Sequence, residues 1–295
     1  MASFPPSSTG FAVVSTQPDI RLFYSVTPAL PLDASKPVIV LANSLAATTA
    51  LWDTFTTEFA PTHTIVRYDA RFHGHSPLSS TNGFDYEKGH SMDDLADDVI
   101  AVLDTIGVAS PLTFIGLSIG GGVGVSLAAR YPDRFSSFVV VGSRSHAAPG
   151  DAARMAERAA YYRSHGARAQ AEQSVERWFG NEWPKASPEN EKLALQVADI
   201  VVQTPVEGFE ASAAALNRMD LRGQAATIGS RGDGRRVLFV VGADDGKLVV
   251  DESRQLAETT GSRLEVVADC GHIVNVQQPT RFHAIVRAWL ADTKA

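Results

Sequence analysis

The sequence Gly116-Leu117-Ser118-Ile119-Gly120 decides the fold of this chain. It follows an apolar run over residues 111–115, which predicts a buried strand, and it precedes residues 121–130, which predict a helix. Glycine tolerates backbone kinks that residues with side chains cannot adopt. A serine between small residues at such a strand-to-helix turn is typical of a nucleophile elbow, which raises the Ser118 hydroxyl above the sheet.

Around this turn, further apolar runs indicate a sheet with helices between its strands. Several are near-continuous Val, Ile, Leu and Phe, as expected for parallel strands that helices cover on both faces. Residues 92–106 have helical periodicity, and Ser91 with Asp94 predicts a capping box at the start of that helix. We therefore predict an α/β fold with a mostly parallel sheet flanked by helices. The other predicted strands are residues 11–15, 20–25, 38–42, 64–68, 138–141, 237–241 and 264–267.

The strand pattern stops between residues 149 and 220. This segment is rich in Ala, Arg and Glu, and it is broken at Trp183-Pro184 and Thr204-Pro205. Open α/β sheets bind ligands at the carboxyl ends of their strands, and an insertion after the sixth strand would cover that edge. We expect a core formed by residues 1–148 and 221–295, with a helical lid inserted at residues 149–220.

The composition excludes several classes of partner. The chain has 26 Lys and Arg against 33 Asp and Glu, a net charge of -7, and no basic cluster longer than Arg235-Arg236. This argues against nucleic acid as a partner. Residues 1–10 lack the apolar core of a secretory signal, no later stretch is long enough to span a bilayer, and the single cysteine, Cys270, fits a reducing compartment. We expect a cytoplasmic protein without a membrane partner, and a homo-oligomer is compatible with the sequence.

A serine hydroxyl needs a base to remove its proton, and an imidazole held by a carboxylate is the best arrangement. Two predicted strand ends downstream of Ser118 carry such groups in the expected order: Asp244-Asp245 after residue 241, and His272 after residue 267. We predict His272 as the general base and Asp245 as the acid, with Asp244 as the alternative acid. These residues predict a serine hydrolase.

Such a hydrolase also needs two backbone N–H groups that stabilise the negative oxygen of the reaction intermediate. One comes from the residue after the nucleophile, which is Ile119, and the other from the loop after the third strand. That loop contains Asn43-Ser44-Leu45, so we predict the Leu45 N–H as the second donor.

Other residues with reactive or aromatic side chains are weaker candidates for the functional site. His73 and His75 could suggest a metal, but nothing nearby completes a ligand set, so we expect a role in loop structure and no metal. A lone cysteine at a strand end, as Cys270 is, more often packs than reacts. Trp178 and Trp183 are candidates to line a pocket, with a small core inside the lid as the alternative role.

With these residues identified, the chain resembles the α/β-hydrolase superfamily and, within it, the 3-oxoadipate enol-lactonases of aromatic catabolism. Carried over by position, the resemblance implies Ser118, Asp245 and His272 as a catalytic triad, in agreement with the prediction from the residues. It departs at Phe72, where these enzymes usually have glycine. The matching motifs are Asn43-Ser44-Leu45 with Trp52, Arg67-Tyr68-Asp69-Ala70-Arg71 with His73-Gly74, Gly116-Leu117-Ser118, Gly271-His272, Arg177-Trp178-Phe179, residues 204–209 and residues 219–222.

The expected function is therefore a serine hydrolase that opens a small-molecule lactone or ester through an acyl-enzyme without a cofactor. An anionic lactone needs a cation in the pocket, and Arg144 is a candidate, with a surface role as the alternative. The alternatives to a lactonase are a general carboxylesterase, a carbon-carbon bond hydrolase of the same fold, and a non-catalytic ligand-binding protein. The expected substrate-binding residues are Asn43, Ser44, Trp52, Arg144 and Trp178.

Overall fold

The computed structural model describes residues 4–80, 83–109 and 112–293, so Pro111 of the predicted central strand lies outside the described residues. Within these ranges, one eight-stranded sheet has the strand order β1-β2-β4-β3-β5-β6-β7-β8. The first strands pair as antiparallel neighbours, and the pairs from β4 through β3 to β8 are parallel. The strands are β1 (Ser8–Thr16), β2 (Asp19–Thr27), β3 (Val38–Ala42), β4 (Thr64–Tyr68), β5 (Leu112–Leu117), β6 (Phe135–Val141), β7 (Val237–Gly242) and β8 (Arg263–Val267).

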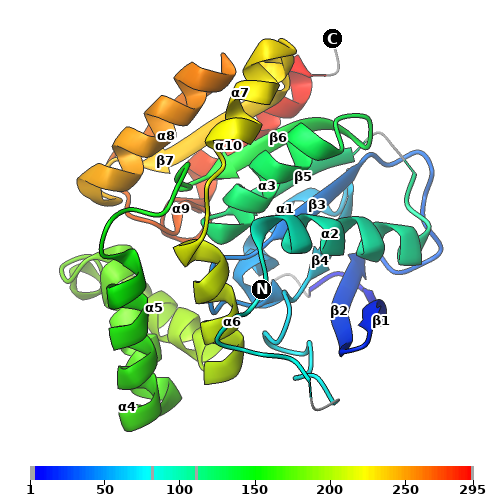
Figure 1. The fold of residues 1–295 in the computed structure, drawn as a ribbon. Coiled ribbons are helices and arrows are strands. Elements are labelled where there is room, and N and C mark those ends of the chain that lie inside the picture. Colours follow the sequence, from blue (N-terminus) through cyan, green and yellow to red (C-terminus); the bar gives the residue numbers. More distant parts are fainter. Residues whose placement is uncertain (1–3, 81–82, 110–111, 294–295) are drawn as a thin grey trace.

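Helices connect the parallel strands and cover the sheet (Figure 1). Helices α2, α3, α7 and α8 pack in a row, each against the next, whereas α1 packs against α10. No helix within the described ranges is long and apolar enough to cross a membrane. The helices are α1 (Asp53–Phe59), α2 (Met92–Ile106), α3 (Ile119–Arg130), α4 (Asp151–Phe179), α5 (Pro188–Val201), α6 (Val206–Asn217), α7 (Arg222–Ser230), α8 (Gly246–Thr260), α9 (Val274–Gln277) and α10 (Pro279–Asp292), with short 3₁₀ turns η1 (Thr49–Trp52), η2 (Pro184–Ala186) and η3 (Asp233–Arg236).

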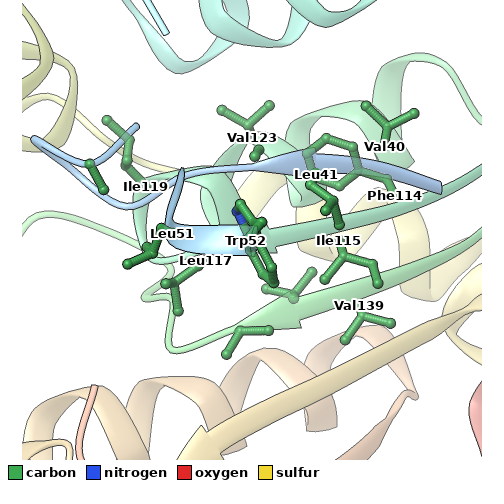
Figure 2. Close-up of a cluster of buried hydrophobic side chains, with 14 of the residues drawn as sticks. Val40, Leu41, Leu51, Trp52, Phe114, Ile115, Leu117, Ile119, Val123 and Val139 are labelled. Atoms are coloured by element: carbon green, nitrogen blue, oxygen red, sulfur yellow. The ribbon is translucent and has the colours of Figure 1, made fainter. Parts of the chain in front are cut away.

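The hydrophobic core lies on both faces of the central strands. In Figure 2, Phe114 lies on the same side of the strands as Val123 of α3, and Ile115 lies on the opposite side with Trp52. Successive residues of a strand point to opposite faces, so a strand covered on both sides is apolar at every position. The near-continuous apolar runs in the sequence have this origin, and the predicted parallel sheet is confirmed.

The start of α2 is also confirmed in detail. The Ser91 side chain accepts a hydrogen bond from the backbone N–H of Asp94, and the Asp94 carboxylate accepts one from the backbone N–H of Ser91. Gly107 closes the helix with a left-handed φ of 76°. Together these local signals fix both ends of the helix.

Helices α4, α5 and α6 lie between β6 and β7 in the chain and gather at one end of the sheet, at the lower left in Figure 1. The chain segments that lead into and out of this group run side by side. His146 and Asp220 form an isolated antiparallel bridge, and the N–H of Ala147 donates to the carbonyl oxygen of Met219 over 2.8 Å.

Candidate active site

Ser118 lies at the sharp turn between β5 and α3. Its φ of 59° and ψ of -115° fall in a region that residues with side chains rarely adopt, and such strain is concentrated at functional sites. The adjacent strand β6 holds this conformation, because the N–H of Ser118 donates to the carbonyl oxygen of Val141 over 2.8 Å. A Cβ atom on Gly116 would lie 2.0 Å from the carbonyl oxygen of Gly120. The predicted strand-to-helix turn is therefore present and requires a glycine at position 116.

Asp245 and His272 form a close pair beside this turn. Nδ1 of His272 lies 2.8 Å from each carboxylate oxygen of Asp245, and both side chains are largely buried. Because a carboxylate oxygen only accepts, Nδ1 carries the proton, which leaves Nε2 of the neutral imidazole free to act as a base. The alternative acid, Asp244, is exposed, and its backbone N–H donates to the carbonyl oxygen of Cys270.

A single cavity of about 390 Å³ brings these residues together. Ser118, Asp245 and His272 all line it, although they come from the turn after β5, the turn after β7 and the loop after β8. Parallel strands bring such loops to one edge of the sheet, which is where ligands bind in open α/β folds. The volume is in the range of pockets that hold small organic molecules.

The loop after β3 lies against the same cavity. Leu45 lines the cavity wall, and the following residue, Ala46, has a left-handed φ of 64°. On the other side, Ile119 is the first residue of α3, where backbone N–H groups have no partner within the helix. The two predicted donors thus come from the loop and the helix start that flank Ser118.

His73 supports the conformation of this loop. Its Nδ1 lies 2.8 Å from the carbonyl oxygen of Arg71, so this nitrogen carries the proton, and Nε2 accepts a hydrogen bond of 3.2 Å from the N–H of Ala46. Burial lowers the pKa of His73, which keeps the ring neutral and Nε2 able to accept. The expected role of His73 in loop structure therefore has a specific form that the sequence did not indicate.

The other predicted substrate-binding residues take different positions. Ser44 and Trp178 line the cavity. Asn43 is buried beside it and donates from Nδ2 to the carbonyl oxygen of Tyr68 over 2.9 Å. Trp52 is fully buried and packs against the rings of Phe55 and Phe282, because it lies on the face of the sheet that α1 and α10 cover. The lining of the cavity, taken over the described residues, includes neither Asn43 nor Trp52.

Arg144 lines the cavity with its charge already balanced. Its guanidinium donates to Oδ2 of Asp151 over 2.6 Å, and Arg154 pairs with the other oxygen of that carboxylate. Cys270 is buried, and burial raises the pKa of its thiol to about 12, so it is not a thiolate at neutral pH. Within the described ranges, no group of three His, Cys, Asp or Glu side chains is arranged to hold a metal.

Comparison with known proteins places this site in a family. The sequence profile of the alpha/beta hydrolase fold matches residues 37–279, most of the chain. The chain belongs to the α/β-hydrolase family. Among individual proteins, this α/β-hydrolase is 32% identical over 275 residues to 3-oxoadipate enol-lactonase 2 of Acinetobacter baylyi, covering 92% of this chain and 94% of that protein.

Two further relatives are also described as enol-lactonases. 3-Oxoadipate enol-lactonase 1 of Acinetobacter baylyi is 25% identical to this α/β-hydrolase, with coverage of 83% of this chain and 85% of the relative. The crystal structure of the enol-lactonase from Burkholderia xenovorans LB400 superposes with a TM-score of 0.80 at 26% identity, over 96% of this chain and 100% of that one. The resemblance to enol-lactonases is confirmed at the level of sequence and fold.

Several cavity residues were not predicted from the sequence, and two of them are arginines of one helix. Arg158 and Arg177 of α4 both line the cavity that contains Ser118. In the sequence they are two among several arginines of a helical segment, where most face solvent. The available signals were the four-residue spacing of Arg158 from Arg154 and the place of Arg177 directly before Trp178.

Proposed function

We propose that this α/β-hydrolase opens a lactone or ester through a covalent acyl-enzyme, with Ser118, His272 and Asp245 as the catalytic triad. The observation that carries the proposal is the contact of His272 Nδ1 with both Asp245 oxygens at 2.8 Å, in the cavity that Ser118 lines. A histidine oriented in this way presents Nε2 to a serine hydroxyl. The similarity to two enol-lactonases supports an enol-lactone as the substrate.

In the proposed reaction, Oγ of Ser118 attacks the carbonyl carbon of the lactone while His272 Nε2 takes the hydroxyl proton. The N–H groups of Leu45 and Ile119 donate to the resulting oxyanion, and each such donor contributes about 3 kcal/mol of transition-state stabilisation. His272 then donates its proton to the ring oxygen as the bond between the carbonyl carbon and that oxygen breaks.

Water completes the cycle. His272 removes a proton from a water molecule, the hydroxide attacks the acyl carbon, and the proton returns to Oγ of Ser118 as the acyl-enzyme bond breaks. When the substrate is an enol-lactone, the released enol tautomerises to a ketone, which makes the ring opening effectively one-way. No step needs a cofactor.

The segment of residues 149–220 is proposed as the lid over this site. Eight of its residues line the cavity: Asp151, Arg154, Met155, Arg158, Arg177, Trp178, Leu216 and Met219. Lid residues therefore form one wall of the proposed substrate pocket, and the core supplies the triad.

The test combines turnover with covalent labelling. The wild-type enzyme should hydrolyse an enol-lactone and bind a fluorophosphonate at Ser118, whereas Ser118→Ala should lose the label and several orders of magnitude in kcat. A panel with simple aryl esters and diketones separates the lactonase from a carboxylesterase and from a carbon-carbon bond hydrolase. Near-full activity in Ser118→Ala would overturn the mechanism, and absence of labelling in the wild type would favour a ligand-binding protein.

A further inference from the structure

The oxyanion loop, residues 43–48 after β3, contains a turn with an alanine in an unfavourable conformation. The N–H of Ala47 donates to the carbonyl oxygen of Ser44 over 3.1 Å, so Leu45 and Ala46 are the two middle residues of this turn. Ala46 has a left-handed φ of 64°, a conformation that turns usually give to glycine. Contacts from outside the loop must therefore hold Ala46 in place.

Two hydrogen bonds hold the backbone of Ala46, one from the core and one from the helical segment. The N–H donates to Nε2 of His73 over 3.2 Å, and the carbonyl oxygen accepts a hydrogen bond of 3.1 Å from Oγ1 of Thr204. Both Ala46 and Thr204 are buried, so bulk water does not compete for the second bond. A residue of the helical segment thus contributes one of the two contacts that hold the strained alanine.

The position of Thr204 is fixed from within the helical segment. Thr204 lies between α5 and α6, and its carbonyl oxygen accepts a hydrogen bond of 2.7 Å from the phenol of Tyr162 in α4. Its own N–H donates to the carbonyl oxygen of Val201 over 3.2 Å. Burial and the negative charge of Glu207 raise the pKa of Tyr162, so the phenol keeps the proton that it donates. Both polar groups of the Thr204 backbone are therefore paired inside the helical segment.

A second close approach joins the same part of the helical segment to the residues that support the loop. Gly208 lies in the first turn of α6, and a Cβ atom on it would be 2.2 Å from the carbonyl oxygen of Phe72. Phe72 directly precedes His73, whose Nε2 accepts the hydrogen bond from the Ala46 N–H. Helix α5 also packs against η1, which follows the loop in the chain. The connection between α5 and α6 therefore lies against both the loop and the segment that supports it.

We propose that Thr204 is a positioning residue of the oxyanion hole: its hydroxyl holds the carbonyl oxygen of Ala46, which keeps the Leu45 N–H directed at the oxyanion. This inference rests on the proposed function for the reaction, and it adds a residue of the helical segment to the groups that act on the transition state. Peptide groups are planar, so a rotation at Ala46 moves the neighbouring peptide groups of the turn as rigid units. The helical segment thereby acts on the rate of the chemical steps as well as forming a wall of the pocket.

Thr204→Val removes the hydroxyl and keeps the shape of the side chain. The wild type and the variant are compared on α-angelica lactone, a small enol-lactone, and on p-nitrophenyl acetate, a small aryl ester. Acylation and deacylation both form an oxyanion, so kcat should fall by about tenfold while KM stays within about twofold of the wild type. Thr204→Ser keeps the hydroxyl and should retain kcat within about threefold. A wild-type kcat in Thr204→Val would overturn the proposal.

Phenylboronic acid reports on the oxyanion hole through a transition-state analogue. Oγ of Ser118 adds to the boron atom, the hydroxyl proton passes to His272, and the tetrahedral boronate carries the negative charge. Its inhibition constant against p-nitrophenyl acetate hydrolysis should rise about tenfold in Thr204→Val, in line with kcat/KM. Thr260→Val removes a buried hydroxyl that donates to the carbonyl oxygen of Leu256 in α8, and this matched control should keep the wild-type constants. An unchanged inhibition constant in Thr204→Val would contradict the positioning role.

Amide hydrogen exchange tests the contact without any reaction. Peptides that cover residues 43–48 should exchange about tenfold faster in Thr204→Val than in the wild type, because the Ala46 carbonyl oxygen loses its donor and the loop opens more often. Peptides from α2 should exchange as in the wild type, and so should the loop in Thr260→Val. Unchanged exchange of residues 43–48 in Thr204→Val would overturn the proposal. If the wild type hydrolyses neither compound and does not bind the fluorophosphonate, the proposed function fails, and the exchange measurement still decides whether Thr204 holds the loop.

Discussion

The backbone N–H of His272 donates to the carbonyl oxygen of Trp178 over 2.8 Å. The indole of Trp178 also stacks near the imidazole, with ring centres 6.4 Å apart and planes at 28°. Trp178 belongs to α4, whereas His272 follows β8 of the sheet. The helical segment therefore helps to hold the proposed catalytic base in place, as well as forming a wall of the pocket.

Gly271→Ala should disturb this contact. A Cβ atom at position 271 would lie 2.3 Å from the carbonyl oxygen of Trp178. This is too close to a backbone atom, so the backbone at position 271 or at Trp178 would have to move. We expect kcat to fall by about 10- to 100-fold, because a displacement near 1 Å of a reacting group has an effect of this size. Steady-state kinetics on an enol-lactone measures the change. Gly223→Ala in α7, where the added atom meets nothing within 4 Å, is the matched control and should keep wild-type kinetics.

Asp245→Asn and Asp244→Asn should separate the two candidate acids. Asp245 contacts Nδ1 of His272 with both oxygens, so the amide would favour the wrong tautomer of the imidazole and lower kcat by about 10⁴-fold. Asp244 is exposed and contributes its backbone N–H to the turn, which the substitution retains. Steady-state kinetics of both variants tests which aspartate is the acid of the triad. A larger loss of kcat in Asp244→Asn than in Asp245→Asn would reverse the assignment.

His73→Ala should weaken the oxyanion loop. The substitution removes the acceptor of the Ala46 N–H, and Ala46 holds a strained φ of 64° next to Leu45. We expect kcat to fall by about tenfold or more with KM little changed, which is part of the roughly 3 kcal/mol that a lost oxyanion donor costs. His75→Ala, at a largely exposed ring, serves as the control. An unchanged kcat in His73→Ala would mean that the loop keeps its conformation without this bond.

The free energy of unfolding should fall in mild acid because of the buried imidazole of His90. Burial, with the positive charge of Arg71, lowers its pKa from 6.5 to about 3. The unfolded chain therefore binds a proton near pH 6.5 that the folded protein does not, and stability is full above that pH and falls as the pH drops. At pH 5 the loss from this residue is about 2 kcal/mol.

Urea unfolding of the wild type and of His90→Gln at pH 7.5 and pH 5 measures this effect. The loss between the two pH values should be smaller in the variant by the amount assigned to His90. His73 and His283, whose pKa values burial also lowers, titrate in both proteins and cancel in the comparison. The same pH dependence in both proteins would show that His90 titrates normally when folded.

Phe72→Gly should restore the residue that the related enzymes usually have and still destabilise this chain. Phe72 has a left-handed φ of 65°, which glycine adopts without strain. Its ring, however, is fully buried and packs 4.7 Å from Phe84 and 5.0 Å from Tyr86. The lost packing exceeds the relieved strain, so we expect the free energy of unfolding to fall by about 2 kcal/mol in a urea titration. A stabilised variant would show that backbone strain dominates at this position.

Patterns within short segments were enough to predict most of the architecture. The apolar runs at residues 38–42 and 64–68 coincide with β3 and β4, and the Ser91–Asp94 capping box fixes the start of α2. These signals are local, because burial on both faces of a strand and hydrogen bonds within one helical turn involve neighbours in the chain. The turn at Ser118 belongs to the same class, since two glycines and two secondary structure elements within a few residues define it.

The surroundings of the site could not be predicted in this way. Trp52 was predicted to bind substrate because it follows the Asn43-Ser44-Leu45 motif. Its side chain instead packs in the core, on the face of the sheet that α1 and α10 cover. Arg144 was the predicted cation of the pocket, and only the structure shows that Asp151 already pairs with it. Such distinctions depend on which distant segments meet, and that information is not contained in the spacing of residues along the chain.

The sequence by itself determined the α/β order of the elements, the strained serine turn and the identity of the residues that could act as acid and base, because each follows from interactions among near neighbours. Only the tertiary structure decided that Asp245 rather than Asp244 faces His272, that the helical segment contacts the His272 loop, and that Arg144 is already paired with Asp151. The physical reason is that hydrogen bonds, burial and charge pairing act between atoms close in space, and the packing of the sheet brings together residues far apart in the chain.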